Sequence, residues 1–308
     1  MKTPCRIAMI GGGLMGHGIA LVMARAGHQV VIVDPVQEAL ASVKNRIKDS
    51  LEALGTEAET TRQSLSRVSL ETDLADAVQS ADFVFEAAPE KLPLKREIFE
   101  AIERYAPPDA IVASNTSVIQ ISKITDGRSS AHRMLGTHWW NPPHLIPLVE
   151  VVKTEWVNDQ AAKSMLALLE AAGKTAVIVE KDVPGFIGNR LQHALWREAV
   201  SLVENGICDA RAVDTVVKAS FGRRLAVLGP LENADLVGTD LTLDIHENVL
   251  FALESRPGPS PYLQQLVEDG KLGMKTGEGF RTWSSDEAET LRSHVGEYLR
   301  TIEKVLPK

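Results

Sequence analysis

Residues 6–18 read RIAMIGGGLMGHG, and this stretch predicts the fold of the first part of the chain. Its apolar start, residues 6–10, is typical of a buried strand, and helical spacing follows it. Gly11, Gly13 and Gly16 have the spacing G-x-G-x-x-G between that strand and that helix. Glycines there allow a tight turn, close approach of the backbone to a pyrophosphate, and close packing of helix on strand. The stretch therefore predicts a Rossmann unit that binds a dinucleotide.

A carboxylate at the end of the next strand specifies the dinucleotide. Asp34 follows the apolar stretch 29–33 and comes 18 residues after Gly16. A carboxylate at this place binds the adenosine ribose hydroxyls and repels a 2′-phosphate. Residues 35–37 contain no arginine to hold such a phosphate, so NAD is favoured over NADP; the alternative is that Asp34 is an ordinary turn residue. The candidate cofactor residues of this unit are Gly11, Gly13, Leu14, Met15, Gly16 and Asp34.

The chain as a whole shows two kinds of periodicity. Up to Asp182, helical spacing alternates with short apolar stretches, which lie at 83–85, 111–113, 133–137, 147–152 and 175–179. This alternation predicts an α/β fold with a mostly parallel, doubly wound sheet. Beyond Asp182 the spacing is helical, with no convincing strand. We therefore predict an NAD-binding Rossmann domain over residues 1–183 and an all-α domain over residues 184–308.

Composition excludes several classes of partner. The formal net charge of −8 disfavours nucleic acid and anionic membranes. No apolar run approaches the roughly 20 residues of a membrane span, and the start does not resemble a signal peptide. The cysteines Cys5 and Cys208 form no disulfide framework, which favours a reducing, cytoplasmic setting. We expect a small-molecule substrate and no metal site.

Three polar groups stand out against apolar surroundings in the first part. Ser114 to Ser117 follow a predicted strand, the usual place for ligand contacts in an open parallel sheet. His138 ends another strand, and Glu150 lies in the apolar run PLVEVV. A carboxylate buried there is costly unless it is paired, and an adjacent histidine would pair with it. Such a pair supplies a base for a hydroxyl proton while hydride leaves for nicotinamide, although a packed core histidine and a structural ion pair remain the alternatives.

Six motifs occur in one order along nearly the whole chain: GGGLMGHG, SNTS, GTHWWNP, PLVEVV, DVPGFIGNR and GMKTGEGF. Together they resemble the L-3-hydroxyacyl-CoA dehydrogenase family. The resemblance implies that His138 is the catalytic base and that Glu150 is its partner. It places Ser117, Asn141 and Asn189 around the substrate carbonyl, the hydroxyl and the nicotinamide, and Glu90 and Lys95 on the nicotinamide side of the cofactor. It also implies S-stereochemistry at the hydroxyl carbon and a substrate that is a 3-hydroxyacyl group.

Two departures from the fatty-acyl branch leave the substrate open between an acyl-CoA and a small free carboxylate. The segment 44–59 begins basic but ends acidic, which opposes a coenzyme A polyphosphate. The stretch GRRLAVLGP at 222–230 is similar to gulonate, lambda-crystallin and carnitine dehydrogenases, and HWWNPPH is similar to a pyridine-carboxylate dehydrogenase branch. Arg223 or Arg224 would then hold a substrate carboxylate, unless both are surface arginines of a helix end. A non-catalytic NAD-binding protein is the rival of another class.

Apolar residues after Pro184 cover more than one face of the predicted helices. They include Phe186, Leu191, Leu195, Trp196, Leu202 and Val203. A helix that is apolar around much of its circumference needs a covering partner. Because the family pairs its helical domains across a two-fold axis, we predict a homodimer with the second domain at its interface.

Overall fold

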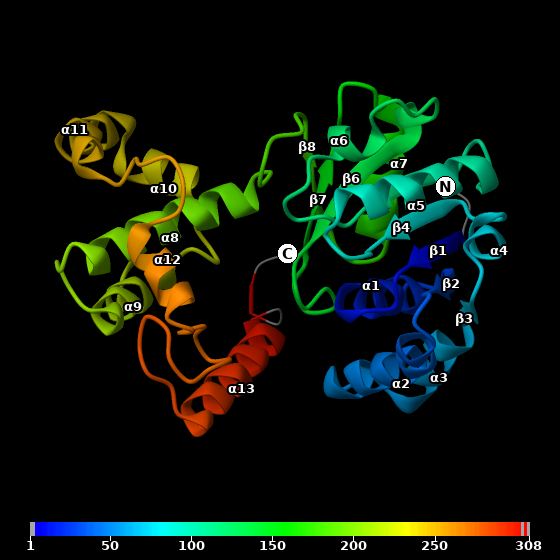
Figure 1. The fold of residues 1–308 in the computed structure, drawn as a ribbon, viewed down its shortest axis with the longest axis horizontal. Coiled ribbons are helices and arrows are strands. Elements are labelled where there is room, and N and C mark those ends of the chain that lie inside the picture. Colours follow the sequence, from blue (N-terminus) through cyan, green and yellow to red (C-terminus); the bar gives the residue numbers. More distant parts are fainter. Residues whose placement is uncertain (1–3, 303–304, 307–308) are drawn as a thin grey trace. The chain divides into compact units, whose positions relative to one another are not determined.

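The computed structural model describes residues 4–302 and 305–306. It divides into two compact units on either side of the bond between Arg190 and Leu191. Figure 1 shows strands and helices in the first unit and helices in the second. The domain boundary predicted between residues 183 and 184 lies shortly before this division and stays a prediction. Each unit is described below by itself.

The first unit is built on one eight-stranded sheet of order β3-β2-β1-β4-β5-β6-β7-β8. Its strands are β1 (Arg6–Ile10), β2 (Gln29–Val33), β3 (Val68–Glu71), β4 (Phe83–Glu86), β5 (Ile111–Ser114), β6 (Met134–Trp139), β7 (Leu148–Val152) and β8 (Thr175–Val179). The first six strands are parallel, while β7 pairs antiparallel with β6 and parallel with β8. The predicted α/β fold with a mostly parallel, doubly wound sheet is therefore confirmed.

Helices cover both faces of this sheet because side chains alternate along each strand. Ile7 and Met9 of β1 enter one buried cluster, and Ala8 and Ile10 enter the other. The helices of the first cluster are α1 (Leu14–Arg25), α2 (Gln37–Ala53) and α7 (Asp159–Ala171), and those of the second are α4 (Leu74–Val78), α5 (Leu92–Tyr105) and α6 (Ile121–Thr125). Each fully buried aliphatic side chain contributes roughly 1.5–3 kcal/mol to folding. The two cores thus hold the sheet rigidly beneath the loops at its ends.

Strand β3 and helix α3 (Ala58–Ser66) were not among the predicted elements. The strand has four residues at the sheet edge, and only Val68 is fully buried. A short edge strand needs few apolar residues, so its sequence VSLE gives little periodic signal.

The second unit is helical in the residues that are described. Helix α8 (Gly188–Glu204) begins before the division and continues into this unit, which also contains α9 (Ala210–Ala219), α10 (Pro230–Val237), α11 (Thr239–Val249), α12 (Pro261–Glu268) and α13 (Ser285–Ile302). Large apolar side chains are exposed on it, including Phe251 at 82% and Leu231 at 79%. Within the described ranges, no helix of either unit is both long enough and apolar enough to span a membrane.

Candidate active site

The glycine-rich turn after β1 has a backbone that only glycine accommodates at two positions. Gly11 has a φ of 96°, and a Cβ on it would lie 2.8 Å from the carbonyl oxygen of Ala87. A Cβ on Gly16 would lie 1.8 Å from the carbonyl oxygen of Gly11, which no side chain could avoid. A Cβ on Gly13 would meet nothing within 4 Å, so this side of the turn is open. The open turn and the exposed N-terminus of α1 fit a dinucleotide pyrophosphate.

Asp34 is held against this turn by backbone donors. Its Oδ2 accepts a hydrogen bond from the N–H of Gly12 at 2.7 Å, and its Oδ1 accepts one from Val36 at 2.8 Å. Arg46 of α2 donates to the carbonyl oxygen of the same Gly12 and to that of Ala39 at 3.2 Å. Residues 35–37 contain no arginine, and Arg46 was not predicted as a residue of the cofactor turn. Nothing in the local spacing marks it, since it comes from the helix that folds back onto the turn.

The carboxyl ends of β4 and β5 carry a second group of polar residues. Glu90 accepts hydrogen bonds from the hydroxyl of Thr116 at 2.9 Å and from the N–H of Ser117 at 2.7 Å. Lys95, by contrast, is fully buried, and its Nζ donates to Glu86 at 2.7 Å and to the carbonyl of Ala88 at 3.2 Å. Because its ammonium is enclosed by Glu86 and Ala88, Lys95 would not contact a bound cofactor directly in this structure.

Glu86 was not predicted as a site residue. It ends β4 and is fully buried. Two features of the sequence could have indicated Glu86. It is a carboxylate at the end of the apolar strand FVFE, and a lysine follows nine residues later in a helix.

His138 and Glu150 lie directly opposite each other in the antiparallel pair of β6 and β7. Nδ1 of His138 lies 2.7 Å from Oε2 of Glu150, and the two residues are only 3% and 1% exposed. The other carboxylate oxygen accepts hydrogen bonds from the N–H groups of Ile187 at 2.9 Å and Gly188 at 3.0 Å. Every oxygen of this buried carboxylate is thus satisfied, which offsets its desolvation.

These contacts set the charge state of Glu150. Burial raises the pKa of its carboxyl group, but the hydrogen bond from His138 and those from the N–H groups of Gly188 and Ile187 lower it more. The net pKa lies below the usual range of a glutamate, so the carboxylate is ionised at neutral pH.

Aromatic rings enclose His138. The ring centroids of Trp140 and Phe186 lie 5.3 Å and 5.5 Å from that of His138. Phe186 has a φ of 50°, a left-handed conformation that no other non-glycine residue adopts within the described ranges. A Cβ on Gly188 would lie 2.4 Å from Cζ2 of Trp140, so the absence of a side chain there makes room for the indole. Trp140 and Phe186 therefore pack against the imidazole, and Gly188 packs against the indole.

Of the remaining predicted polar residues, Ser117 and Asn189 are in contact at the carboxyl ends of the strands. Asn189, at the start of α8, donates from Nδ2 to the carbonyl of Ser117 at 3.2 Å. This bond joins the turn after β5 to the segment whose N–H groups bind Glu150. Asn141 is exposed in the loop after β6. Arg223 and Arg224 belong to the second unit, where both are exposed at the end of a short 3-10 helix (Phe221–Arg223).

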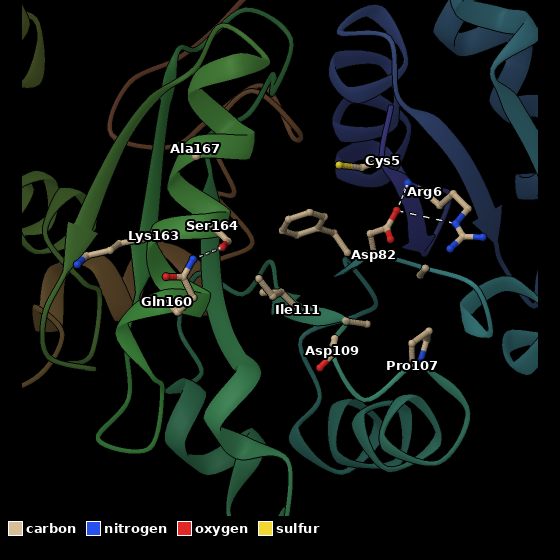
Figure 2. A pocket seen from close by; sticks show the side chains of 13 residues that line it. Cys5, Arg6, Asp82, Pro107, Asp109, Ile111, Gln160, Lys163, Ser164 and Ala167 are labelled. Carbon is tan, nitrogen blue, oxygen red and sulfur yellow. Dashed lines mark hydrogen bonds and ion pairs between the residues drawn. The ribbon is translucent and has the colours of Figure 1, made fainter. Parts of the chain in front are cut away.

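A cavity of about 630 Å³ lies at the amino ends of the strands, opposite the end that carries the candidate active site. Figure 2 shows its lining, with Arg6 of β1 and Asp82, just before β4, on one side and Gln160 and Ser164 of α7 on the other. These are the amino ends of the strands, whereas ligands of open α/β sheets bind outside the carboxyl ends. The cavity is therefore separate from the candidate active site.

Comparison with known proteins agrees with this geometry. Residues 6–183 match the 3-hydroxyacyl-CoA dehydrogenase NAD binding domain, and residues 185–283 match the C-terminal domain of the same family. The chain belongs to the 3-hydroxyacyl-CoA dehydrogenase family. Its cofactor is NAD, and it is an NAD-dependent dehydrogenase acting on a CH–OH group. The predicted resemblance, cofactor and enzyme class are confirmed.

Individual relatives come from two branches of the family. The chain is 35% identical over 303 residues to 5-formyl-3-hydroxy-2-methylpyridine 4-carboxylate 5-dehydrogenase of Mesorhizobium japonicum, covering 97% of each chain. It is 39% identical over 287 residues to human mitochondrial hydroxyacyl-coenzyme A dehydrogenase, covering 89% of this chain and 90% of that one.

Two solved structures are also similar to the chain. The structure of a 5-formyl-3-hydroxy-2-methylpyridine 4-carboxylic acid 5-dehydrogenase, described as an NAD+ dependent dismutase, is similar with a TM-score of 0.89, 34% identity and 97% coverage of each chain. FadB2 of M. tuberculosis is similar with a TM-score of 0.77 and 34% identity, covering 92% of this chain and all of that one.

Proposed function

We propose that this enzyme interconverts a 3-hydroxyacyl substrate and its 3-oxo form, with His138 as the acid/base and Glu150 as its partner. The observation that carries the proposal is the buried hydrogen bond of 2.7 Å between Nδ1 of His138 and Glu150. It leaves Nε2 as the ring nitrogen that faces the substrate. Bound NAD supplies the hydride acceptor.

In the oxidative direction, the hydroxyl proton of the substrate moves to Nε2 of His138 as the C=O bond forms. The imidazolium that results donates from Nδ1 to Glu150, which is ionised and stabilises the positive charge. In the reverse direction the same proton returns to the alkoxide oxygen. Glu150 thus holds one tautomer and one orientation of the ring through both directions.

Ser117 and Asn189 are proposed to orient the substrate oxygen. The hydrogen bond from Asn189 to the Ser117 carbonyl keeps both residues at the carboxyl edge of the sheet, within the same unit as His138. Their remaining hydroxyl and amide groups are suited to a hydroxyl or carbonyl oxygen, since each offers a donor and an acceptor.

A second candidate substrate is a small free carboxylate with an oxidisable hydroxyl group. It is supported by the similarity over 97% of both chains to the pyridine-carboxylate dehydrogenase, whose TM-score of 0.89 exceeds the 0.77 of FadB2. Arg223 and Arg224 are proposed to hold the carboxylate in this case, because a guanidinium binds it with two parallel hydrogen bonds.

One experiment tests both candidates. NADH formation is followed with a panel of 3-hydroxyacyl-CoAs, small hydroxy acids and formyl pyridine carboxylates. Turnover of the thioesters supports the first candidate, and turnover of the free acids alone replaces it with the second. In the second case Arg223→Ala or Arg224→Ala should raise KM by an amount equivalent to about 1.5–3 kcal/mol, with partial recovery in the lysine variants. Unchanged kinetics in both alanine variants would remove the arginines from the substrate site.

The remaining expectations are also proposals. We propose that residues 1–183 and 184–308 act as cofactor and substrate domains, that the enzyme is a homodimer, and that it works in the cytoplasm. The last rests on the sparse cysteines, Cys5 and Cys208, and fractionation of cells with an antibody against the protein would test it.

A further inference from the structure

Two opposite charges are completely buried at the carboxyl end of β4. The side chains of Glu86 and Lys95 are both 0% exposed, with Nζ and Oε1 2.7 Å apart. Removing two ions from water costs several kcal/mol each, and a buried pair is often no more stabilising than apolar side chains of the same volume. Stability alone therefore does not account for this pair.

The pair is connected to the backbone that follows β4. Glu86 Oε1 also accepts a hydrogen bond from the N–H of Ala88 at 2.6 Å, and Oε2 accepts one from the hydroxyl of Ser114 at 2.5 Å. Lys95 donates to the carbonyl of Ala88 at 3.2 Å and lies 3.7 Å from Oε2 of Glu90. Ala88 is thus held through both its N–H and its carbonyl group, and Glu90 is held by the ammonium.

The segment held in this way borders the cofactor turn. A Cβ on Gly11 would lie 2.8 Å from the carbonyl of Ala87 and 3.4 Å from the nitrogen of Ala88, so the two backbones are in contact. On the other side, Glu90 binds the N–H of Ser117. In a Rossmann fold the half of the sheet that begins with β4 receives the second mononucleotide of the cofactor, here the nicotinamide half.

We propose that Glu86 is a positioning residue for the cofactor. Glu86 fixes Lys95, and the pair together fixes Ala88 and Glu90, so that the walls on both sides of the nicotinamide half are pre-formed before NAD binds. Pre-formed walls raise affinity because no ordering of the loop has to accompany binding. The inference uses the NAD cofactor and does not depend on which alcohol is oxidised.

The test compares three variants: Glu86→Gln, Lys95→Met and the double variant. Each is measured for the dissociation constant of NADH, from its fluorescence, and for Tm without ligand. Each single change leaves one buried charge without its partner and should lower Tm. The double variant buries no charge, so its Tm should return to within a few degrees of wild type. Its dissociation constant for NADH should nevertheless stay at least tenfold above wild type, because Ala88 and Glu90 have lost the ammonium.

A matched control lies at the other end of α5. Glu103 is a carboxylate bonded to the N–H and hydroxyl of Ser130 and to the hydroxyl of Ser129, away from the glycine turn. Glu103→Gln should change Tm while leaving the dissociation constant of NADH within threefold of wild type.

A double variant that binds NADH within threefold of wild type would overturn the proposal and make the pair purely structural. If the double variant does not fold, Ser114→Ala decides instead, since it removes one donor to Glu86 and little volume. In that variant a rise of threefold or more in the dissociation constant supports the proposal, and a smaller change overturns it.

Discussion

At the scale of single residues, Glu150 connects the stability of the protein with its chemistry. Its carboxylate accepts three hydrogen bonds, from His138, Ile187 and Gly188, and its pKa is lowered as a result. A carboxyl group whose folded pKa is lowered contributes stability above its ordinary pKa of 4.5, and that contribution is lost as the pH falls through the folded value. Acid should therefore weaken the fold at Glu150, the proposed partner of the catalytic base.

The first prediction is that Glu150→Gln slows turnover without weakening NAD binding. The amide keeps the shape but carries no charge to stabilise the imidazolium. The acid limb of the pH–rate profile for alcohol oxidation should therefore move to lower pH. His138→Ala removes the proton acceptor and should reduce kcat by about 10²–10⁴.

These variants are checked by steady-state kinetics across pH and by NADH titration. A folded His138→Ala enzyme with near-normal turnover would contradict the assignment. Loss of NADH binding in that variant would mean instead that His138 has a structural role. The pH dependence of unfolding in Glu150→Gln should be flatter below pH 4.5 than in wild type.

At the scale of elements, the βαβ unit determines which dinucleotide is bound. Asp34 and Arg46 both contact Gly12, one through its N–H and the other through its carbonyl. The carboxylate repels a 2′-phosphate, whereas the guanidinium attracts it. The unit therefore brings one negative and one positive side chain to the same residue, Gly12.

We predict that NAD is preferred over NADP by at least tenfold, which corresponds to about 1.4 kcal/mol. Asp34→Ala should narrow this preference, and Arg46→Ala should widen it. The measurement is kcat/KM with each cofactor at fixed salt, since screening weakens both effects. Equal efficiency with the two cofactors in wild type would refute the role of Asp34, and an unchanged ratio in Arg46→Ala would mean that Arg46 only ties α2 to the turn.

The contact between the start of α8 and the loop after β6 gives a third prediction. Gly188→Ala places a Cβ only 2.4 Å from Cζ2 of Trp140, well inside van der Waals contact. The indole must shift, and its ring neighbour His138 should shift with it. We expect a loss of about 1–3 kcal/mol in stability, which is typical of overpacking, and a drop in kcat of tenfold or more.

Adding Trp140→Phe to Gly188→Ala removes the atoms that clash and should restore most of both losses. Gly296→Ala in α13 is the control, because its Cβ would approach only the flexible tip of Arg300, at 3.4 Å. Unchanged turnover in Gly188→Ala would show that the indole does not set the position of His138.

At the largest scale, the second unit exposes many large apolar side chains to solvent. Leu195 and Trp196 of α8 are 41% and 50% exposed, and Phe251 is 82% exposed. Large clustered apolar surface marks an interaction site. We therefore predict a homodimer that covers this surface, with the second unit at the interface.

Light scattering at micromolar concentration checks this prediction, and a mass near twice 33.5 kDa is expected. Trp196→Glu should shift the equilibrium towards the monomer, because a buried unpaired carboxylate is costly in an interface. A wild-type mass of one chain at all accessible concentrations would contradict the prediction.

The βαβ unit, the alternation of strands and helices and the NAD cofactor could all be predicted from the amino-acid sequence. These features follow from local rules. The required glycines are two to five residues apart, and Asp34 follows a strand whose position is visible from its apolar residues. The change to helical periodicity after Asp182 is local as well. Strand β3 was not predicted because an edge strand of four residues shows almost no periodic pattern of apolar residues.

Contacts between residues that are distant in the sequence became visible in the folded chain. The antiparallel turn from β6 to β7 sets His138 opposite Glu150, and a shift of one residue would place them on different faces of the sheet. Lys95 was expected on the nicotinamide side of the cofactor, yet its side chain is fully buried and pairs with Glu86 at the end of β4. Arg46 reaches Gly12 only because α2 packs back across the turn. Such contacts depend on strand register and helix packing, which no short window of sequence contains.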